Sequence, residues 1–298
     1  MKKTFIILCL LLAGLWQTAY AFKAKHVVLI ALDGWGAYSV PKAKEIPNIK
    51  KLMEEGCYTL KKRSVLPSSS AINWASMFNG AGTEIHGYTQ WGSKTPELPS
   101  RVLNKHGVFP TIFSIIQEQK PKLKTACLYE WDGIKYLIDS LAVTHHALAS
   151  DYANHPTLLC EMAEQYIKTE RPNFIAVCFD QLDHVGHEIG HDTSAYYEKL
   201  KELDGYVGRI VQAIKDAGIW DDTIIMMTAD HGGIQKGHGG ITLQEMEIPF
   251  IIAGKNVKKG GAFEESMMQY DTASTIAYIL DVKQPQVWIG RPMIQVFK

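Results

Sequence analysis

The chain alternates short apolar runs with longer amphipathic segments, and this alternation most constrains its fold. Five apolar runs lack the in/out alternation of a half-buried strand, which predicts strands buried on both faces. They cover residues 26–32, 124–129, 173–179, 223–229 and 249–254. Helical patterns lie between them, such as IPNIKKLMEEG, TLLCEMAEQYIKTE, SAYYEKLKELDGYVGRIVQAIKDAG and YDTASTIAYILD. The pattern predicts an α/β fold with a mainly parallel sheet and helices on both faces.

The first 21 residues predict a secretory signal peptide. Two lysines precede an apolar run from Phe5 to Trp16, and the sequence AYA at 19–21 is a small-x-small cleavage site. The run is shorter than the roughly 18 to 20 residues that a membrane span needs, so no span is expected after cleavage. We therefore expect a secreted or periplasmic product that consists of one domain, residues 22–298.

The composition after cleavage argues against several classes of protein. Lys and Arg number 29 against 31 Asp and Glu, so no basic nucleic-acid-binding surface is indicated. No CxxC motif occurs among Cys57, Cys127, Cys160 and Cys178, which excludes a thiolate zinc site. Disulfide pairing stays open, but buried free thiols are favoured because Cys127 and Cys178 lie in apolar strand-like runs.

Acidic residues follow three of the predicted strands directly. Asp33 follows the first strand, Asp180 and Asp183 follow the third, and Asp230 follows the fourth. Ligands of open α/β sheets bind outside the carboxyl ends of the strands. Acids from separate strands can therefore converge in one crevice.

Histidines accompany these acids at spacings that suit a metal site. In DHVGH, Asp183 and His187 stand four residues apart, which places both on one face of a helical turn. Carboxylate oxygens and imidazole nitrogens are ordinary zinc ligands. Two three-residue sets result: Asp33, Asp230 and His231 in one, and Asp183, His187 and His238 in the other. Each set leaves positions open for water or substrate, as a catalytic site requires.

A structural interpretation of the same residues also stands. An aspartate after a strand can cap a helix, and an isolated loop histidine such as His238 is usually exposed. His184, Glu188 and His191 fit a solvated helix face, although two glycines in DHVGHEIG weigh against a simple exposed helix. Asp180 and His191 are also candidate partners of the ligands.

The stretch LPSSSAINWASMFNG offers a nucleophile. Its three consecutive serines, residues 68–70, precede a helix-like segment, so one serine would stand at a helix N-terminus, where amides and the helix dipole favour an anion. A serine hydroxyl is unreactive at neutral pH unless a base or a metal activates it. A metal is the activator that this sequence offers.

Five motifs in this order, LDGWG, SSSAINWASMFNGAGTEIHGY, DHVGHEIG, TADHGG and GHGG, resemble the alkaline phosphatase superfamily of metal-dependent hydrolases. The branch most similar is the nucleotide pyrophosphatase/phosphodiesterase type, in a short version. The resemblance runs from about His26 to the IGRPM segment near the C-terminus, and it implies an alkaline-phosphatase-like α/β fold. LDGWG also resembles cofactor-independent phosphoglycerate mutases, but this chain has little room for their large inserted domains.

The resemblance implies a role for each matching residue. Six residues would hold two metals: Asp33, Asp230 and His231 one of them, and Asp183, His187 and His238 the other. The nucleophile falls on Ser70, which also contacts a metal, and Asn73 three residues later would steady a phosphoryl oxygen. Two zinc ions are expected, and manganese or iron also suits these donors.

We expect from the resemblance an exported hydrolase of small-molecule phosphate esters, with phosphodiesters or nucleotide pyrophosphates as substrates and a phosphoserine intermediate. The phosphodiesterase branch usually has threonine followed by an apolar residue and proline, whereas Ser70 is followed by Ala71 and Ile72. A phosphomonoesterase, a sulfate ester hydrolase and an inactive ligand-binding relative stay open as alternatives. The sulfatase pattern is disfavoured because its proline and arginine places hold Ile72 and Trp74.

Aromatic residues near these motifs have two interpretations. They are Trp74, Tyr88, Trp91 and Trp131. They could line a wall for a base or an aryl leaving group, or they could pack in the core or a lid.

Overall fold

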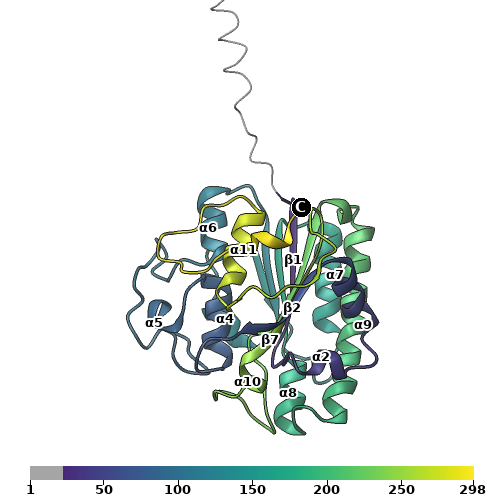
Figure 1. Cartoon of the computed structure of the whole chain (residues 1–298). Helices are drawn as coiled ribbons and strands as arrows, with labels where there is room; N and C mark the ends of the chain where they lie inside the picture. The colour runs from purple at the N-terminus through teal and green to yellow at the C-terminus, as the bar shows by residue number, and fades with distance from the viewer. Residues whose placement is uncertain (1–22) are drawn as a thin grey trace, which may run out of the picture.

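The computed structural model describes residues 23–298, so the predicted signal peptide, residues 1–21, lies outside the described residues. Its centre is an eight-stranded sheet in the order β4-β3-β5-β1-β6-β7-β2-β8 (Figure 1). The strands are β1 His26–Leu32, β2 Cys57–Arg63, β3 Thr125–Tyr129, β4 His145–Leu148, β5 Phe174–Phe179, β6 Thr223–Thr228, β7 Glu247–Gly254 and β8 Gly261–Ala262. All five predicted strands are present.

The central strand β1 is parallel to both of its neighbours, β5 and β6. Every residue of these three strands is buried, because helices cover both faces of the sheet. β3 and β4 continue the parallel part, while β7 is antiparallel to β6 and to β2. The predicted α/β class with a mainly parallel sheet is confirmed.

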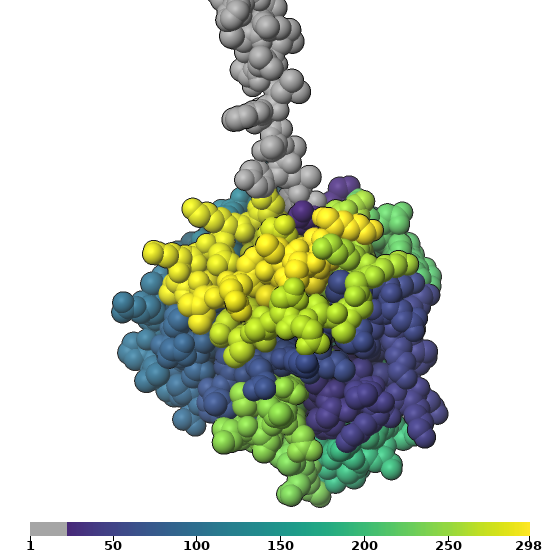
Figure 2. All heavy atoms as spheres, in the orientation of Figure 1, coloured from purple at the N-terminus to yellow at the C-terminus, as the bar shows by residue number. Residues whose placement is uncertain are grey.

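Two layers of helices enclose the sheet (Figure 1). One layer holds α3 Pro47–Glu55, α7 Leu158–Glu170, α8 Gln181–Glu188 and α9 Ser194–Asp216. The other holds α4 Ser70–Asn79, α6 Ile112–Gln119 and α11 Asp271–Ile279. The short helices are α2 Ser39–Lys42, α5 Thr83–His86, α10 Leu243–Met246 and the 3₁₀ turns η1 Asp132–Tyr136, η2 Trp220–Asp222 and η3 Ile294–Val296. The C-terminal segment, yellow in the space-filling view, covers the upper part of the molecule (Figure 2).

Other expectations from the sequence also have outcomes in the fold. The four predicted helical segments correspond to α3, α7, α9 and α11. Cys57, Cys127, Cys160 and Cys178 are all buried free thiols, which agrees with the favoured interpretation. Within residues 23–298, no helix is both long and apolar enough to cross a membrane.

The sequence does not predict β2, because its second half, LKKR, resembles a solvated segment. The Lys62 side chain is instead fully buried, and its Nζ donates to Thr228 Oγ1 and Thr272 Oγ1, each at 2.8 Å. Its ammonium group also lies 5.8 Å from the centre of the Phe250 ring. Pairing with β7 and these tertiary contacts therefore decide the strand, rather than its hydrophobic pattern.

Gly80 ends the helix that carries the serine run. Its φ of +60° is left-handed, and its carbonyl accepts hydrogen bonds from the amides of Ile289 and Gly290 at 2.9 and 3.0 Å. A Cβ at Gly80 would lie 2.4 Å from the Trp288 ring. Gly218 has a similar φ of +72°, but no described heavy atom lies within 4 Å of its Cβ position.

We predict that Gly80→Ala lowers the free energy of unfolding by about 3 kcal/mol, because backbone strain adds to a steric clash. Gly218→Ala should cost about 1 kcal/mol, because only the backbone strain applies. Urea denaturation of both variants measures the difference. Equal losses would contradict the steric contribution of Trp288.

Candidate active site

The carboxyl ends of three adjacent strands carry the candidate residues. β5, β1 and β6 are neighbours in the sheet, so the segments that leave them are forced together. Asp33 follows β1, and its amide donates to Phe179 O at the end of β5 at 2.8 Å. Asp183 and His187 lie on α8, which follows β5, and Asp230 follows β6. The predicted convergence of acids from independent strands is present in the structure.

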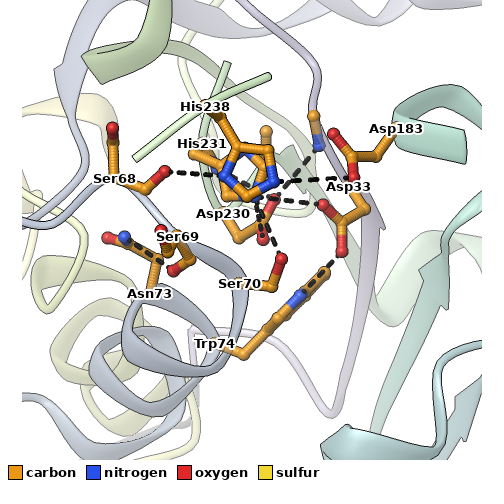
Figure 3. A network of polar contacts seen from close by, with 12 residues as sticks. Asp33, Ser68, Ser69, Ser70, Asn73, Trp74, Asp183, Asp230, His231 and His238 are labelled. Carbon is orange, nitrogen blue, oxygen red and sulfur yellow. Dashed lines mark hydrogen bonds and ion pairs between the residues drawn. The ribbon is translucent and has the colours of Figure 1, made fainter. Parts of the chain in front are cut away.

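The first donor group contains Asp33, Asp230 and His231, whose ligand atoms lie within 4.8 Å of one another (Figure 3). His231 Nε2 is 3.4 Å from Asp33 Oδ1 and 3.2 Å from Asp230 Oδ2. Both of these oxygens are buried and have no hydrogen-bond partner among the described residues. Buried carboxylate oxygens that face one another without a partner fit a divalent cation.

The second donor group lies beside the first. Ligand atoms of Asp183, His231 and His238 lie within 4.8 Å of one another, so His231 faces both groups. His187 Nε2 is 3.1 Å from Asp183 Oδ2 and 3.1 Å from His238 Nε2. All six residues predicted as ligands therefore come together, and their donor set suits zinc, manganese or iron.

Three of the histidines make the same kind of backbone contact. Each has its Nδ1 at a backbone carbonyl: His187 at Lys236 O (3.0 Å), His231 at Gly232 O (2.8 Å) and His238 at Ser68 O (3.1 Å). An Nδ1–H bond to a carbonyl fixes the tautomer and leaves Nε2 free to bind a metal. This arrangement is common among metal-binding histidines and fits the same cations.

The pKa values of the buried carboxylates show that added positive charge would stabilise the site. Burial first, and then the carboxylates of Asp230 and Asp183, raise the pKa of Asp33 well above its usual value. Burial would also raise the pKa of Asp183, but the hydrogen bond with His187 and the nearby His231 hold this pKa below its usual range. Burial lowers the pKa of His231 to about 3, so its imidazole is neutral, which is the form that binds a metal. A divalent cation would remove the repulsion among the carboxylates.

Ser70 is the serine that faces this centre. It is the first residue of α4, it is 7% exposed, and its Oγ lies 3.1 Å from His231 Nε2 (Figure 3). Ser68 lies in the preceding loop, where its Oγ donates to Gly240 O at 2.7 Å and joins the loop to the segment of His238. The structure therefore places a hydroxyl at a helix N-terminus next to the first donor group.

The Asn73 side chain faces the loop that precedes Ser70. This side chain is fully buried, and Oδ1 accepts from the amide of Val65 at 2.7 Å. Its Nδ2 lies 3.1 Å from each of the carbonyl oxygens of Val65, Pro67 and Ser69, which share its two N–H donors. In this structure Asn73 holds the loop that precedes Ser70. The phosphoryl-binding role that the resemblance implied stays a prediction.

The aromatic residues divide between the two interpretations. Trp74 and Tyr88 are buried in the core, and the Trp74 Nε1 donates to Asp33 Oδ2 at 3.1 Å. Trp131 is partly buried, whereas Trp91 is 67% exposed. The packing interpretation is therefore confirmed for Trp74 and Tyr88, and the Trp74 indole also orients Asp33, a predicted ligand.

Sequence reasoning missed two contributors to the site. Glu130 follows β3, and its carboxylate accepts from the Asp180 amide at 2.8 Å and from Gln181 Nε2 at 2.7 Å, which fixes the start of α8. Gly34 has a φ of +69°, and a Cβ there would lie 2.5 Å from Asp183 Oδ1. Two signals in the sequence could have indicated them. Glu130 is an acid directly after a buried strand, and Gly34 directly follows Asp33.

Comparison with known proteins identifies the family. A model described as type I phosphodiesterase / nucleotide pyrophosphatase matches residues 27–247. The chain belongs to this family. Membership confirms the branch of the superfamily that the motifs indicate, and Ser70 and the six convergent residues all fall inside the matched range.

Curated proteins similar to this family member are longer. The bis(5'-adenosyl)-triphosphatase enpp4 of Mus musculus is 25% identical over 222 residues, which cover 71% of this chain and 48% of that protein. The ectonucleotide pyrophosphatase/phosphodiesterase family member 1 of Rattus norvegicus is 25% identical over 227 residues, which cover 72% of this chain and 25% of that protein. The chain thus spans about half or less of the length of these relatives.

Solved structures share the fold. Murine ectonucleotide pyrophosphatase/phosphodiesterase 5 superposes with a TM-score of 0.75 at 13% identity, over 92% of this chain and 100% of that one. A 2-O GAG sulfatase superposes with a TM-score of 0.71 at 14% identity, over 92% of this chain and 74% of that one. These similarities confirm the alkaline-phosphatase-like fold.

We predict that Asn73→Ala lowers the free energy of unfolding by about 3 kcal/mol, because it leaves the amide and the carbonyl of Val65 without a partner and removes the side-chain contacts with Pro67 O and Ser69 O. Asn79→Ala on the same helix is the control. Asn79 is also buried, but its Oδ1 has no partner among residues 23–298, so its loss should be smaller. Denaturant unfolding compares the two. A loss for Asn73→Ala no larger than the control's would contradict the role of Asn73 in anchoring the loop before Ser70.

Proposed function

We propose that this protein is an exported, metal-dependent hydrolase of phosphodiesters or nucleotide pyrophosphates that acts through a phosphoserine intermediate. The observation that carries the proposal is the position of Ser70 Oγ, 3.1 Å from His231 Nε2 at the edge of two adjacent donor groups. Family membership supports the substrate class. Export rests on the predicted signal peptide at residues 1–21.

In the proposed reaction Ser70 works in two half-reactions. In the first, Ser70 Oγ forms a bond to phosphorus as the bond from phosphorus to the leaving oxygen breaks, and the leaving oxygen gains the proton that Oγ loses. In the second, a water oxygen forms a bond to phosphorus as the Oγ–phosphorus bond breaks, and Oγ gains a proton that the water loses. The α4 N-terminus favours the anionic phosphoryl group through the helix dipole.

The two donor groups would hold two divalent cations. When bound, such cations supply positive charge at the phosphoryl oxygens and lower the pKa of the hydroxyl and of the attacking water. Asp33, Asp230 and His231 form the group next to Ser70. We assign Asp183 and His238 to the other cation together with His187, whose Nε2 lies 3.1 Å from both Asp183 Oδ2 and His238 Nε2. We propose zinc as the metal, with manganese or iron as alternatives for this donor set.

Hydrolysis of bis(p-nitrophenyl) phosphate and of p-nitrophenyl phosphate, each with and without added zinc, tests the substrate class. We predict a zinc-dependent preference for the diester, with kcat/KM at least about tenfold higher than for the monoester, which is about 1.4 kcal/mol of selective transition-state binding. A reversed preference would mean a phosphomonoesterase. No turnover of either compound would favour the sulfate ester or ligand-binding alternatives, which p-nitrophenyl sulfate separates.

We predict that Ser70→Ala lowers kcat by at least about 10³-fold, because the nucleophile is lost. Its metal content should stay the same, since the six side chains of the donor groups are intact. Ser69→Ala is the matched control: this neighbour precedes α4 and has no capping hydrogen bond, so its activity should stay close to that of the wild type. Near-normal activity of Ser70→Ala would mean that a water molecule attacks directly and that no phosphoserine forms.

A further inference from the structure

His191 is buried in a way that the proposed reaction does not explain. Its side chain is 0% exposed, yet neither ring nitrogen has a hydrogen-bond partner among residues 23–298. Buried polar groups are nearly always hydrogen-bonded. Two unpartnered nitrogens in one ring therefore indicate that His191 has a hydrogen-bond partner that comes within range only when the geometry of the site changes. This finding also corrects the solvated-face interpretation of His191.

Two glycines make room for the His191 ring. A Cβ at Gly186 would lie 2.4 Å from His191 Nε2, and a Cβ at Gly233 would lie 2.3 Å from the same atom. Gly186 stands between Asp183 and His187 on α8, and Gly233 follows His231 by two residues. The imidazole is therefore wedged between the two segments that carry the donor groups.

The backbone of His191 strengthens this connection. Its amide donates to Gln235 O at 2.6 Å, which fastens the turn after α8 to the segment between His231 and His238. The ring packs against Tyr196, with centroids 5.5 Å apart. Backbone and side chain together thus fix the place of the imidazole relative to both donor groups.

The unpartnered atoms of His191 and Asp183 face each other. His191 Nε2 lies 3.6 Å from Asp183 Oδ1, and this oxygen is also buried without a partner among the described residues. The other oxygen, Oδ2, is directed at His187 Nε2 (3.1 Å) and His238 Nε2 (3.8 Å). The carboxylate thus has one oxygen for the donor group and one oxygen for His191.

We propose that His191 is a positioning residue that donates its Nε2–H to Asp183 Oδ1 and so holds the Asp183 carboxylate for cation binding in the second donor group. A shift of the carboxylate by a few tenths of an ångström would bring the 3.6 Å contact into hydrogen-bond range. The second oxygen of a metal-binding carboxylate is ordinarily hydrogen-bonded, and loss of such a partner weakens metal affinity about 10- to 100-fold. The inference rests on the metal centre of the proposed function and is independent of the substrate.

Two variants separate the hydrogen bond from the volume of the ring. His191→Phe keeps an aromatic ring between Gly186 and Gly233 but has no N–H group. His191→Gln has an amide nitrogen that can reach the place of Nε2. His184→Gln is the control, because His184 is exposed on the same helix. Urea denaturation of the metal-free proteins shows whether each variant is folded.

The measurement is zinc binding to the metal-free full chain, by competition with a chromophoric chelator. We expect two zinc ions in the wild type and in His184→Gln. In His191→Phe, one zinc ion should bind about 10- to 100-fold more weakly while the other changes by less than about threefold. His191→Gln should lie between His191→Phe and the wild type.

Other results would overturn the inference in distinct ways. If both variants bind two zinc ions as tightly as the wild type, His191 only fills space, and the proposed function is unaffected. Equal weakening of both sites in His191→Phe and His191→Gln would likewise exclude a specific hydrogen bond to Asp183. If the wild type binds no zinc, manganese or iron, the metal centre itself is wrong, and the proposed function fails together with the inference.

Discussion

The repulsion among buried carboxylates at the ends of β5, β1 and β6 is the constraint on which the rest of the site depends. Burying unpaired charge costs several kcal/mol, so each carboxylate needs compensation. Asp33 receives it from Trp74 Nε1, and Asp230 receives it from the amides of Gly34 and His231 at 3.2 and 2.8 Å. The unpartnered oxygens of Asp33 and Asp230 are both directed at the neutral imidazole of His231. Compensation by backbone and indole N–H groups on one side leaves the other side free for cations.

Glycines let the segments that carry these carboxylates approach closely enough to share a site. Gly34 allows the segment after β1 to approach Asp183, and Gly186 and Gly233 allow α8 and the segment after β6 to close around His191. A side chain at any of these positions would push apart the residues that converge. The same logic explains a helical glycine at Gly186, which costs about 1 kcal/mol of helix stability and makes room for a buried ring.

The sequence predicted the fold well where hydrophobic pattern and burial agree, and it failed where polar residues are buried by their partners. The five apolar runs became strands, whereas β2 depends on the contacts of Lys62 with Thr228 and Thr272. The same difference separates the site residues. Ser70 and the ligand candidates came together as predicted, but Asn73 faces the backbone of its own loop, because a carboxamide can bind any nearby amide or carbonyl.

The sequence by itself determined the order of the strands along the chain, the acids and histidines that follow them, and the family motifs. These properties follow from hydrophobic periodicity and from residue type at fixed spacing, which are local in the chain. Only the tertiary structure decided which side chains face the centre. The Asn73 side chain contacts its own loop, Trp74 Nε1 donates to Asp33, and His191 is buried beside Asp183. Side-chain direction depends on contacts between segments far apart in the sequence, and no local pattern encodes those contacts.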